Sequence, residues 1–306
     1  MNVTHTTRWG PRVSDLLPQE LRILVAVAEA RGFSAAAAVL GLTQSAVSHS
    51  VRGSEAKLGA VLFERGRSGA SPTPAGERAV GHARRILRLY EAMGAEARGA
   101  GRDGGRDTLG GVVRIAAFRS AALHLLPPAL ERLTARHPGI RPEVRVVREI
   151  GAGAAGEVAA GRADLGIATL GGAQDAAPPG LLTGVLTQEA YHLVHPAGHP
   201  DPRSLPLMDW DENCGSYTRA WWRAQDWIPR ATVKAEDDAM VLTMVGRGLG
   251  MAIMPELSLK EATEAVEITG LGPQGPLRQV GYVTTPEAAS TLAIRALIRE
   301  LRSERG

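Results

Sequence analysis

The stretch "SAAAAVLGLTQSAVSHSVRGSEAKL", residues 34–58, decides the fold of the first third of the chain. Ser34 has the short hydroxyl side chain of a helix N-cap, and Gly41 permits the left-handed conformation that ends a helix. Thr43 is suited to cap a second helix that runs to about Leu58. Two helices joined by a short turn with a glycine are typical of a helix-turn-helix motif.

The segments on either side extend this motif. Apolar residues at positions 21, 24, 25 and 28 have the spacing of an amphipathic helix. After the motif, "VLFERGRSGASPTPAG" at 61–76 favours a β-hairpin, or wing, over a helix. Thr73 and Pro74 then suit the N-cap and first position of another helix. Residues 16–75 are therefore predicted to form a winged helix-turn-helix domain.

A long helix is predicted over residues 76–98. Ala79, Ala83, Ile86, Tyr90 and Met93 follow one another in steps of 4, 3, 4 and 3 residues, the spacing of a coiled-coil seam. The seam predicts that the helix pairs with a second copy of itself, and an ordinary amphipathic helix is the alternative. Residues 99–111 are rich in glycine and in charged side chains, so they are predicted to form a flexible linker.

The remainder, residues 112–306, alternates between strand and helix patterns. "VVRIAA" at 112–117, "EVRVV" at 143–147 and "LGIAT" at 165–169 are predicted strands, with helical segments between them. A second cycle follows from about residue 190, and a helix closes the chain. Alternation of this kind predicts an α/β domain with a parallel sheet.

Composition narrows the class of protein. The chain has 306 residues, of which 22% are charged and 44% hydrophobic, as in ordinary globular proteins. Its apolar runs are shorter than the ~20 residues of a membrane span, and its first residues lack the apolar core of a secretory signal. We therefore expect a cytoplasmic protein with no membrane partner. Cys214 is the only cysteine, which excludes an intramolecular disulfide and a cysteine-based zinc site.

Charge is uneven along the chain. The first 100 residues contain 13 Lys and Arg against 8 Asp and Glu, whereas the remainder contains 22 against 24. The N-terminal third is thus the basic end, which is suited to a polyanion such as DNA.

Together these segments resemble the LysR-type transcriptional regulators over nearly the whole chain. The residues that carry the resemblance are 21–65 with "PTPAG" in the N-terminal part, and "GVVRIAA", "LLPPALERLTARHPGI", "AAGRADLGIAT" and "GRGLGMAIMP" beyond it. The sequence departs from the family at Ser54, where a core leucine is usual, at Gly53 before it, and at Ser45, where proline is frequent. Val47, Val51 and Leu58 are still expected to form an apolar stripe.

The resemblance implies an α/β fold overall. An N-terminal winged helix-turn-helix and a long linker helix would precede a two-lobed effector-binding domain similar to the type 2 periplasmic binding proteins. Lobe 1 would comprise about residues 112–186 and 285–306, and lobe 2 about 187–284. The implied function is a sequence-specific DNA-binding transcriptional regulator controlled by a small molecule, not an enzyme.

By resemblance, residues 43–58 form the recognition helix. The side chains expected to enter the major groove are Gln44, Ser45, Ser48 and His49. Gln44 can form two hydrogen bonds with adenine. Phosphate contacts are expected from Arg52, from Arg65 and Arg67 in the wing, and from the helix N-terminus at Ser34. For any one of these arginines the alternative is a solvated surface charge.

By the same resemblance, the effector lies in a cleft between the lobes. The residues expected to line it are Phe118, Arg119, Ser120 and Thr169 in lobe 1, and Ser216, Tyr217 and Thr218 in lobe 2. Arg119 favours an anionic ligand. The alternative is that Arg119 pairs with an acid of the protein.

Two other motifs point elsewhere. Gly151, Gly153 and Gly156 fit the G-x-G-x-x-G pattern of dinucleotide sites, but the helix that follows ends near Gly161 and is too short for that fold. His192, His195 and His199 could suggest a metal, yet they lie along a strand and turn. The sequence therefore predicts no cofactor and no metal. A solute-binding module and a nucleotide-dependent enzyme remain the alternative functions.

The expected partners follow from this reading. They are double-stranded DNA, a small-molecule effector, further copies of the chain in a dimer and then a tetramer, and RNA polymerase.

Overall fold

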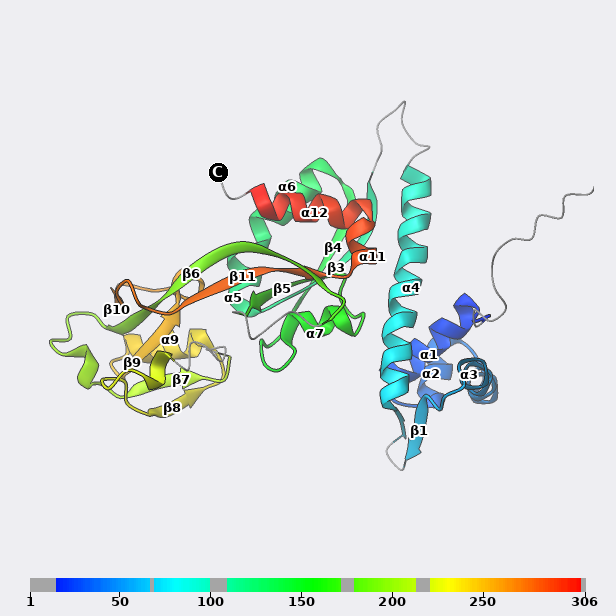
Figure 1. Cartoon of the computed structure of the whole chain (residues 1–306), viewed down its shortest axis with the longest axis horizontal. Helices are drawn as coiled ribbons and strands as arrows, with labels where there is room; N and C mark the ends of the chain where they lie inside the picture. The colour runs from blue at the N-terminus through cyan, green and yellow to red at the C-terminus, as the bar shows by residue number, and fades with distance from the viewer. Residues whose placement is uncertain (1–14, 67–68, 100–108, 172–178, 213–220, 304–306) are drawn as a thin grey trace, which may run out of the picture. The chain divides into compact units, whose positions relative to one another are not determined.

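The computed structural model describes residues 15–66, 69–99, 109–171, 179–212 and 221–303. The chain divides into two compact units, Met1–Glu91 and Ala92–Gly306 (Figure 1).

The described part of the first unit is a cluster of helices with a β-hairpin. Its elements are α1 (Pro18–Ala30), α2 (Phe33–Leu40), α3 (Gln44–Leu58), β1 (Phe63–Gly66), β2 (Gly69–Pro72) and the beginning of α4 (Pro74–Gly99). The Thr43 hydroxyl accepts the Ala46 amide at 3.2 Å, which confirms this N-cap. Gly41 ends α2 with a φ of 65°. The N-cap of α2 is Gly32, so the prediction that Ser34 caps this helix was wrong.

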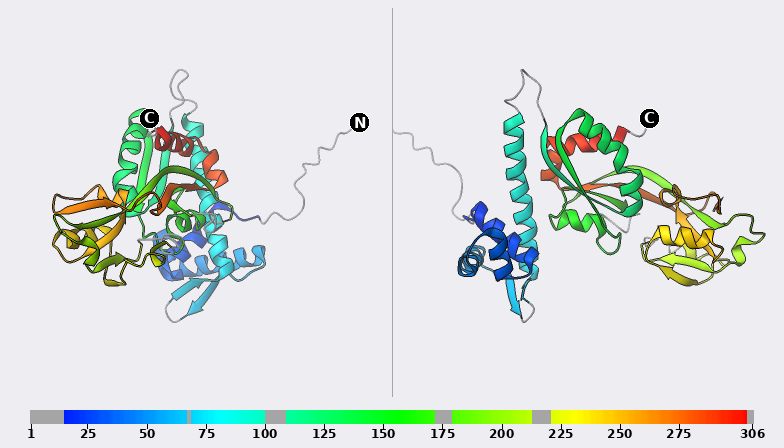
Figure 2. Two further views of the ribbon diagram at one scale, coloured as in Figure 1. Left: turned by 60° about the vertical axis from the view of Figure 1, so that its left-hand side comes forward. Right: turned by 180° about the vertical axis from the view of Figure 1, so that it is seen from behind.

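The β-hairpin is the predicted wing. β1 and β2 are antiparallel, and they project from the helices (Figure 2). The Ala70 amide donates to the Arg31 carbonyl at 2.9 Å. Gly69 has a φ of 115°, and a Cβ there would clash with the same carbonyl. A glycine is therefore required where the wing meets the end of α1.

A small apolar core joins α1, α2, α3 and the wing. Its buried residues include Leu24, Val27, Val47, Val51 and Leu62. Ser54, at the position where a leucine was expected, is fully buried and donates its hydroxyl to the Ser50 carbonyl at 3.0 Å. This bond satisfies the polar group within its own helix. Leu58 is 38% exposed, so the predicted apolar stripe ends before it.

The long helix α4 begins where the sequence predicts. Thr73 caps it by accepting the Gly76 amide at 3.0 Å. Ala83 is buried and Ala79 packs against the core of the first unit, so these two positions of the predicted seam face inward. Farther along, Ile86, Leu89, Tyr90 and Met93 are exposed. At the ends of the predicted linker 99–111, Gly99 belongs to α4, and Gly110 and Gly111 belong to β3; residues 100–108 lie outside the described residues.

The second unit is built on one continuous mixed sheet. Its first half contains β3 (Gly110–Ala117), α5 (Arg119–His124), α6 (Leu126–Arg136), β4 (Gly139–Val146), α7 (Gly153–Ala159) and β5 (Leu165–Leu170). The rest contains β6 (Leu182–Pro196), η1 (Pro202–Ser204), β7 (Leu207–Trp210), β8 (Ala231–Ala235), α9 (Asp238–Gly246), β9 (Met251–Pro255), α10 (Glu256–Leu259), β10 (Val266–Gly270), β11 (Leu277–Thr284), α11 (Pro286–Ser290) and α12 (Leu292–Arg302).

The strand order is β4-β3-β5-β11-β6-β9-β7-β8, with β10 also paired to β6. β3 is parallel to β4 and β5, and β7 is parallel to β8 and β9, as the alternating pattern predicts. The long strands β6 and β11 are antiparallel to each other and run from one lobe to the other (Figure 1). β11 also pairs with β5, so a lobe boundary at residue 284 would separate two hydrogen-bonded strands of lobe 1.

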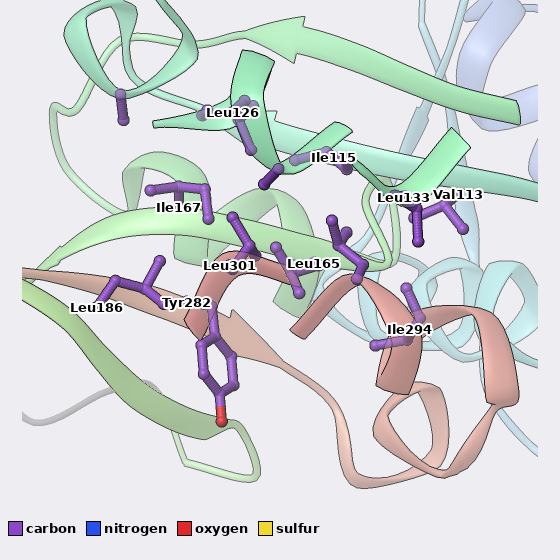
Figure 3. Close-up of a cluster of buried hydrophobic side chains, with 14 of the residues drawn as sticks. Val113, Ile115, Leu126, Leu133, Leu165, Ile167, Leu186, Tyr282, Ile294 and Leu301 are labelled. Carbon is purple, nitrogen blue, oxygen red and sulfur yellow. The ribbon is translucent and has the colours of Figure 1, made fainter. Parts of the chain in front are cut away.

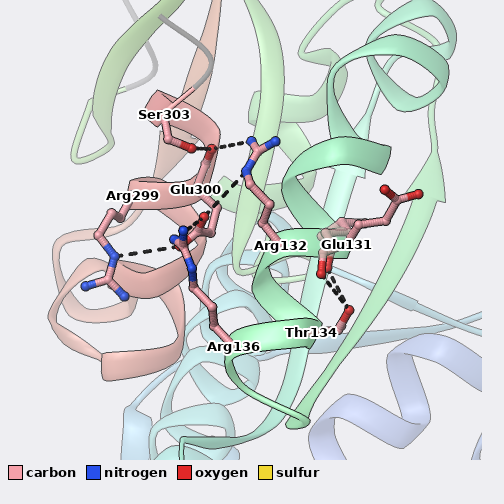
Figure 4. Close-up of polar contacts among 8 residues, drawn as sticks. Glu131, Arg132, Thr134, Arg136, Arg299, Glu300 and Ser303 are labelled. Atoms are coloured by element: carbon pink, nitrogen blue, oxygen red, sulfur yellow. Dashed lines mark hydrogen bonds and ion pairs between the residues drawn. The ribbon is translucent and has the colours of Figure 1, made fainter. Parts of the chain in front are cut away.

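Lobe 1 closes around the last helix. Its core gathers side chains from β3, α6, β5, β6, β11 and α12 (Figure 3): Val113, Ile115, Leu126, Leu133, Leu165, Ile167, Leu186, Tyr282, Ile294 and Leu301. At its edge the fully buried Glu300 of α12 binds Arg136 at 2.6 Å, with Arg132 and Arg299 also within ion-pair distance (Figure 4). These contacts tie α12 to α6.

Candidate DNA-binding face and effector cleft

The first candidate site is the N-terminal part of α3. Gln44, Ser45, His49 and Arg52 are exposed there. Ser48 is only 4% exposed, so the prediction that its hydroxyl contacts DNA is corrected. Four of the five predicted side chains on this helix thus remain on its surface.

Two basic side chains of α3, Arg52 and Lys57, differ in whether their charge is paired within the unit. The Arg52 Nε donates to the Ser48 carbonyl at 3.3 Å and the side chain stays exposed. Lys57 instead binds both carboxylate oxygens of Glu20 at 2.8 Å. The hydrogen bond from Lys57, followed by that from the Leu17 amide, lowers the pKa of Glu20. Lys57 therefore holds α3 to α1, and its charge is neutralised within the unit.

The remaining predicted DNA contacts come from α2 and the wing. Ser34 is exposed in the first turn of α2. Arg65 lies in β1, opposite Ala70 in the hairpin. Arg67 lies outside the described residues.

The second candidate site is a cavity of about 480 Å³ between the two lobes. Both lobes supply its wall: Phe118, Arg119, Ser120, Val146, Val147, Arg148 and Glu149 from one, and Trp210, Glu212, Glu236, Asp237, Asp238 and Ser258 from the other, with Arg278 on β11. A volume of this size suits a small ligand.

Arg119 bridges the lobes on one side of the cavity. Its Nη1 lies 2.8 Å from Asp238 Oδ1, and its Nη2 lies 2.8 Å from Glu261 Oε2. Asp238 is itself buried and accepts the Ser258 hydroxyl at 2.6 Å. The expectation of an anionic effector rested on Arg119. It loses that basis because two carboxylates of the protein already neutralise this guanidinium.

Arg148 forms a second bridge. Its Nε lies 2.8 Å from Glu212 Oε1, and its Nη2 lies 3.7 Å from Asp211. The other Glu212 oxygen accepts the Glu149 amide at 3.2 Å. The segment after β4 is therefore linked to the end of β7 in the opposite lobe.

Glu149 is held inside the wall by backbone amides. Its two oxygens accept the Ala154 amide at 3.0 Å and the Thr169 amide at 2.9 Å. Burial raises the pKa of Glu149, although these amides and Arg278 oppose the shift. Gly153 has a φ of 48°, and a Cβ there would clash with the carboxylate. Part of the G-x-G-x-x-G pattern is thus the turn that accommodates Glu149.

The predicted cleft residues are only partly brought together. Phe118, Arg119 and Ser120 all line the cavity, at the start of α5. Thr169 does not line it, and its amide binds Glu149 instead, which corrects its predicted role. Ser216, Tyr217 and Thr218 lie outside the described residues, as does Cys214.

The histidines and the helices of the described residues were considered for a metal site and a membrane span. His195, one of the three histidines considered, lies within hydrogen-bond distance of the Pro196 carbonyl and the Thr269 hydroxyl. Within the described ranges no group of three potential metal ligands occurs. In the same part of the chain, no helix is long and apolar enough to cross a membrane.

Comparison with known families matches both units. The model for the bacterial regulatory helix-turn-helix protein, lysR family, matches residues 18–77. The LysR substrate binding domain matches residues 106–306, which is more than half of the chain. The chain belongs to the LysR family.

Individual relatives agree with the family. The probable HTH-type transcriptional regulator LrrA of Synechococcus elongatus is 34% identical over 250 residues, covering 78% of this chain and 81% of LrrA. Full-length OxyR from Pseudomonas aeruginosa is similar in fold, with a TM-score of 0.69 and 22% identity over 94% of this chain and 95% of OxyR. CbnR complexed with its target DNA is also similar in fold, with a TM-score of 0.62 and 20% identity. This similarity covers 94% of this chain and 99% of CbnR.

The family membership decides between the functions considered. This LysR-family protein is a transcriptional regulator with a helix-turn-helix DNA-binding domain and an effector-binding domain. Its relatives are regulators and not enzymes, so the nucleotide-dependent enzyme and the isolated solute-binding module are set aside.

Sequence reasoning missed a buried ion pair of this LysR regulator. Arg278 on β11 and Glu189 on β6 lie opposite each other, with Nε 2.6 Å from Oε1. Glu189 Oε2 also accepts the Leu257 amide at 2.6 Å. The only signal in the sequence is a charge inside each of two apolar strands, and such charges are rarely buried unless they are paired.

Proposed function

We propose that this LysR regulator reads DNA with the exposed N-terminal part of α3 and is controlled by a small molecule in the cavity between its lobes. The observation that carries the proposal is the cavity itself. It is large enough for a ligand, and ion pairs that join the two lobes border it. This role requires the compartment that holds DNA, so a cytoplasmic location is part of the proposal.

The surface of α3 supports the DNA-binding part. Gln44 and His49 offer hydrogen-bonding groups that can reach base edges, and Gln44 suits adenine. Arg52 is exposed on the same helix and suits a phosphate. Short polar residues at the start of a recognition helix are the usual contacts to bases in this motif.

Exposed apolar residues on α4 support self-association. Ile86 is 41% exposed and Met93 is 63% exposed, with Leu89 and Tyr90 between them. Burying such residues against a second copy of the helix removes apolar surface from water. We infer that the protein forms a dimer through α4. The Ile86→Glu variant should therefore sediment as a monomer. A tetramer on DNA and contact with RNA polymerase extend the same proposal.

Control by a ligand requires that the ligand prefer one arrangement of the lobes. The bridges made by Arg119 and Arg148 stabilise the present arrangement, because each joins charges from opposite lobes. A ligand that adds contacts to both walls stabilises it further. A ligand that competes for Asp238 or Glu212 opens it.

The test removes one bridge. Arg119→Ala leaves Asp238 and Glu261 without this partner, so the lobe equilibrium should shift without any added ligand. We expect a changed footprint on DNA fragments that flank the gene, with affinity for those fragments within about threefold of the parent. Arg295→Ala, which replaces an exposed arginine on α12, is the matched control. An Arg119→Ala footprint identical to that of the parent would refute coupling between the cleft and DNA.

A further inference from the structure

The surface of lobe 1 carries a group of five arginines, two on α6 and three on α12. The three on α12 are spaced by 4 and 3 residues, so they share one face of the helix, opposite its buried apolar residues. The two on α6 are four residues apart. Arg132 is half-buried and the others are exposed. We call this surface the lobe 1 arginine face: Arg132, Arg136, Arg295, Arg299 and Arg302.

Part of the arginine face surrounds the buried carboxylate of Glu300. Arg136 donates to both oxygens of that carboxylate, at 2.6 and 2.8 Å. The Nε atoms of Arg132 and Arg299 lie 3.6 and 3.8 Å from the same carboxylate (Figure 4). Three guanidiniums thus share a single negative charge.

The other two arginines are bound to no carboxylate. Arg302 donates to the neutral Tyr282 hydroxyl at 2.6 Å, and Arg295 forms no ion pair within the described part of the chain. Glu131, the other acid of α6, is turned away from Glu300 (Figure 4). The arginine face is therefore strongly positive, although residues 101–306 as a whole contain 22 basic side chains against 24 acidic ones.

This arrangement is partly unfavourable for the fold itself. Arg132 and Arg136, like Arg295 and Arg299, are like charges four residues apart, and such pairs weaken a helix. Arg299 and Arg302 lie in the last turn of α12, where positive charge is favourable. Arg295, however, lies in the first turn of α12, where its charge opposes the helix dipole. Folding alone therefore does not explain the arginine face, and an anionic partner would offset the repulsion.

The same surface has little apolar area. Leu292, at the first position of α12, is the only large apolar side chain exposed in α6 and α12, both of which the structure describes in full. Protein interfaces usually contain an apolar core, whereas interfaces with nucleic acid are polar and strongly positive. The helix-turn-helix domain already brings DNA to this chain. A second contact with the same DNA is favoured because it is intramolecular once the first has formed.

We propose that the lobe 1 arginine face binds the phosphate backbone of the DNA that the helix-turn-helix domain holds. Contacts from arginine to phosphate contain no sequence information, so this surface adds affinity beside the recognised bases without adding base preference. It also displaces counterions, so it makes DNA binding more sensitive to salt. The inference requires neither the cavity nor a ligand, and it is therefore independent of control through the cleft.

The experiment measures DNA binding by the full chain over a series of salt concentrations. The DNA is the shortest fragment flanking the gene that the parent protects, alone and extended by about 20 base pairs on each side. The triple variant, Arg295→Gln with Arg299→Gln and Arg302→Gln, keeps both arginines of α6 beside Glu300. On the extended fragment, its slope of log affinity against log salt should be less steep than that of the parent by about 2 to 3. Its discrimination against single-base variants of the fragment should equal that of the parent.

A matched control removes the same charge from lobe 2. Arg223→Gln with Arg230→Gln and Arg247→Gln replaces three exposed arginines, so it changes the net charge of the chain equally. This lobe 2 variant should bind the extended fragment with the slope of the parent, because none of its arginines belongs to the arginine face.

Smaller changes provide a second measurement. Thermal unfolding shows whether the triple variant is folded. If it is unstable, Arg295→Gln with Arg299→Gln keeps the bond from Arg302 to Tyr282 and should still reduce the slope by about 2. Arg295→Ala alone should reduce the slope by about 1 and leave the boundaries of the footprint in place, so it remains the control for Arg119→Ala.

Two outcomes overturn the inference. The first is a folded triple variant that binds the extended fragment with the slope of the parent, which would leave the arginine face to an acidic protein or to no partner. The second is a lobe 2 variant that lowers the slope as much as the triple variant does. That result would show that net charge, and not contact through this face, determines the salt dependence.

Discussion

The exposed end of α3 and the wall of the cleft are both polar, but they satisfy their polar groups in different ways. Gln44, Ser45 and His49 project from one short stretch of helix toward solvent. In the cleft, Arg119 and Arg278 bind carboxylates that lie 119 and 89 residues away in the sequence. The surface that we propose to meet DNA keeps its polar groups available, whereas the cleft wall uses its charges internally.

The largest effect is expected from breaking the buried ion pair beside the cleft. Glu189→Gln removes the charge that compensates the buried Arg278 and retains the shape of the side chain. We expect a loss of about 3 to 5 kcal/mol in the free energy of unfolding of the second unit, since an unpaired buried charge is strongly destabilising. Urea unfolding monitored by tryptophan fluorescence measures it. Glu264→Gln, on an exposed residue of the same lobe, should leave the midpoint unchanged.

A smaller effect, on DNA affinity, is expected from changes on the exposed end of α3. Gln44→Ala should cost about 1 to 3 kcal/mol of DNA affinity at one or two base pairs, with no change in the unfolding midpoint. Arg52→Ala should weaken binding to all DNA sequences alike. It should also reduce the salt dependence of DNA binding by the equivalent of about one phosphate contact. Fluorescence anisotropy on parent and single-base-variant duplexes separates the two. Equal behaviour of both variants on specific and random DNA would remove α3 as the reading surface.

The smallest effects concern two carboxyls that should respond to pH in opposite directions. The pKa of Glu149 in the cleft is raised by burial, so its ionised form destabilises the folded state above that raised pKa. Its contribution should improve as pH falls toward 4.5, the ordinary value. The pKa of Glu20 is lowered by Lys57, so its stabilising contribution is present above 4.5 and is lost as pH falls through the lowered value.

Variant differences isolate the two carboxyls. The unfolding free energy of the parent minus that of Glu149→Gln should increase as pH falls from neutral toward 4.5, because only the parent gains a proton on Glu149 in the folded state. For Lys57→Gln the difference from the parent should be about 0.2 to 1 kcal/mol near neutral pH and should shrink below pH 4.5. Slopes of the same sign for both pairs would contradict this assignment.

The difference between the regions explains what the sequence could predict. The wing, the cap at Thr43 and the cap at Thr73 depend on residues within a few positions of each other, and all three are found as expected. Ser34 failed as an N-cap because the chain enters α2 two residues earlier, at Gly32. Helix boundaries depend on backbone contacts that propensity alone does not determine.

The cleft was harder to predict because its chemistry is non-local. The placement of Phe118, Arg119 and Ser120 at the cavity follows from a turn after a strand. The partners of Arg119 lie in the other lobe. A pattern of residue types along the chain does not show which distant residues come together in space. The contact at Gly153 is local by comparison, because a Cβ there would clash with the carboxylate of Glu149, four residues earlier.

The bond between Arg136 and Glu300 has a consequence for how the protein is made. The first unit is complete once residue 91 has been synthesised, but lobe 1 lacks α12 until 164 residues after Arg136. At ordinary rates of translation that interval is on the order of ten seconds. During it, a ribosome-bound chain has a finished DNA-binding unit and an effector lobe with its core open to water. Two growing chains that meet through α4 on one messenger would then be committed to each other before either can sense a ligand.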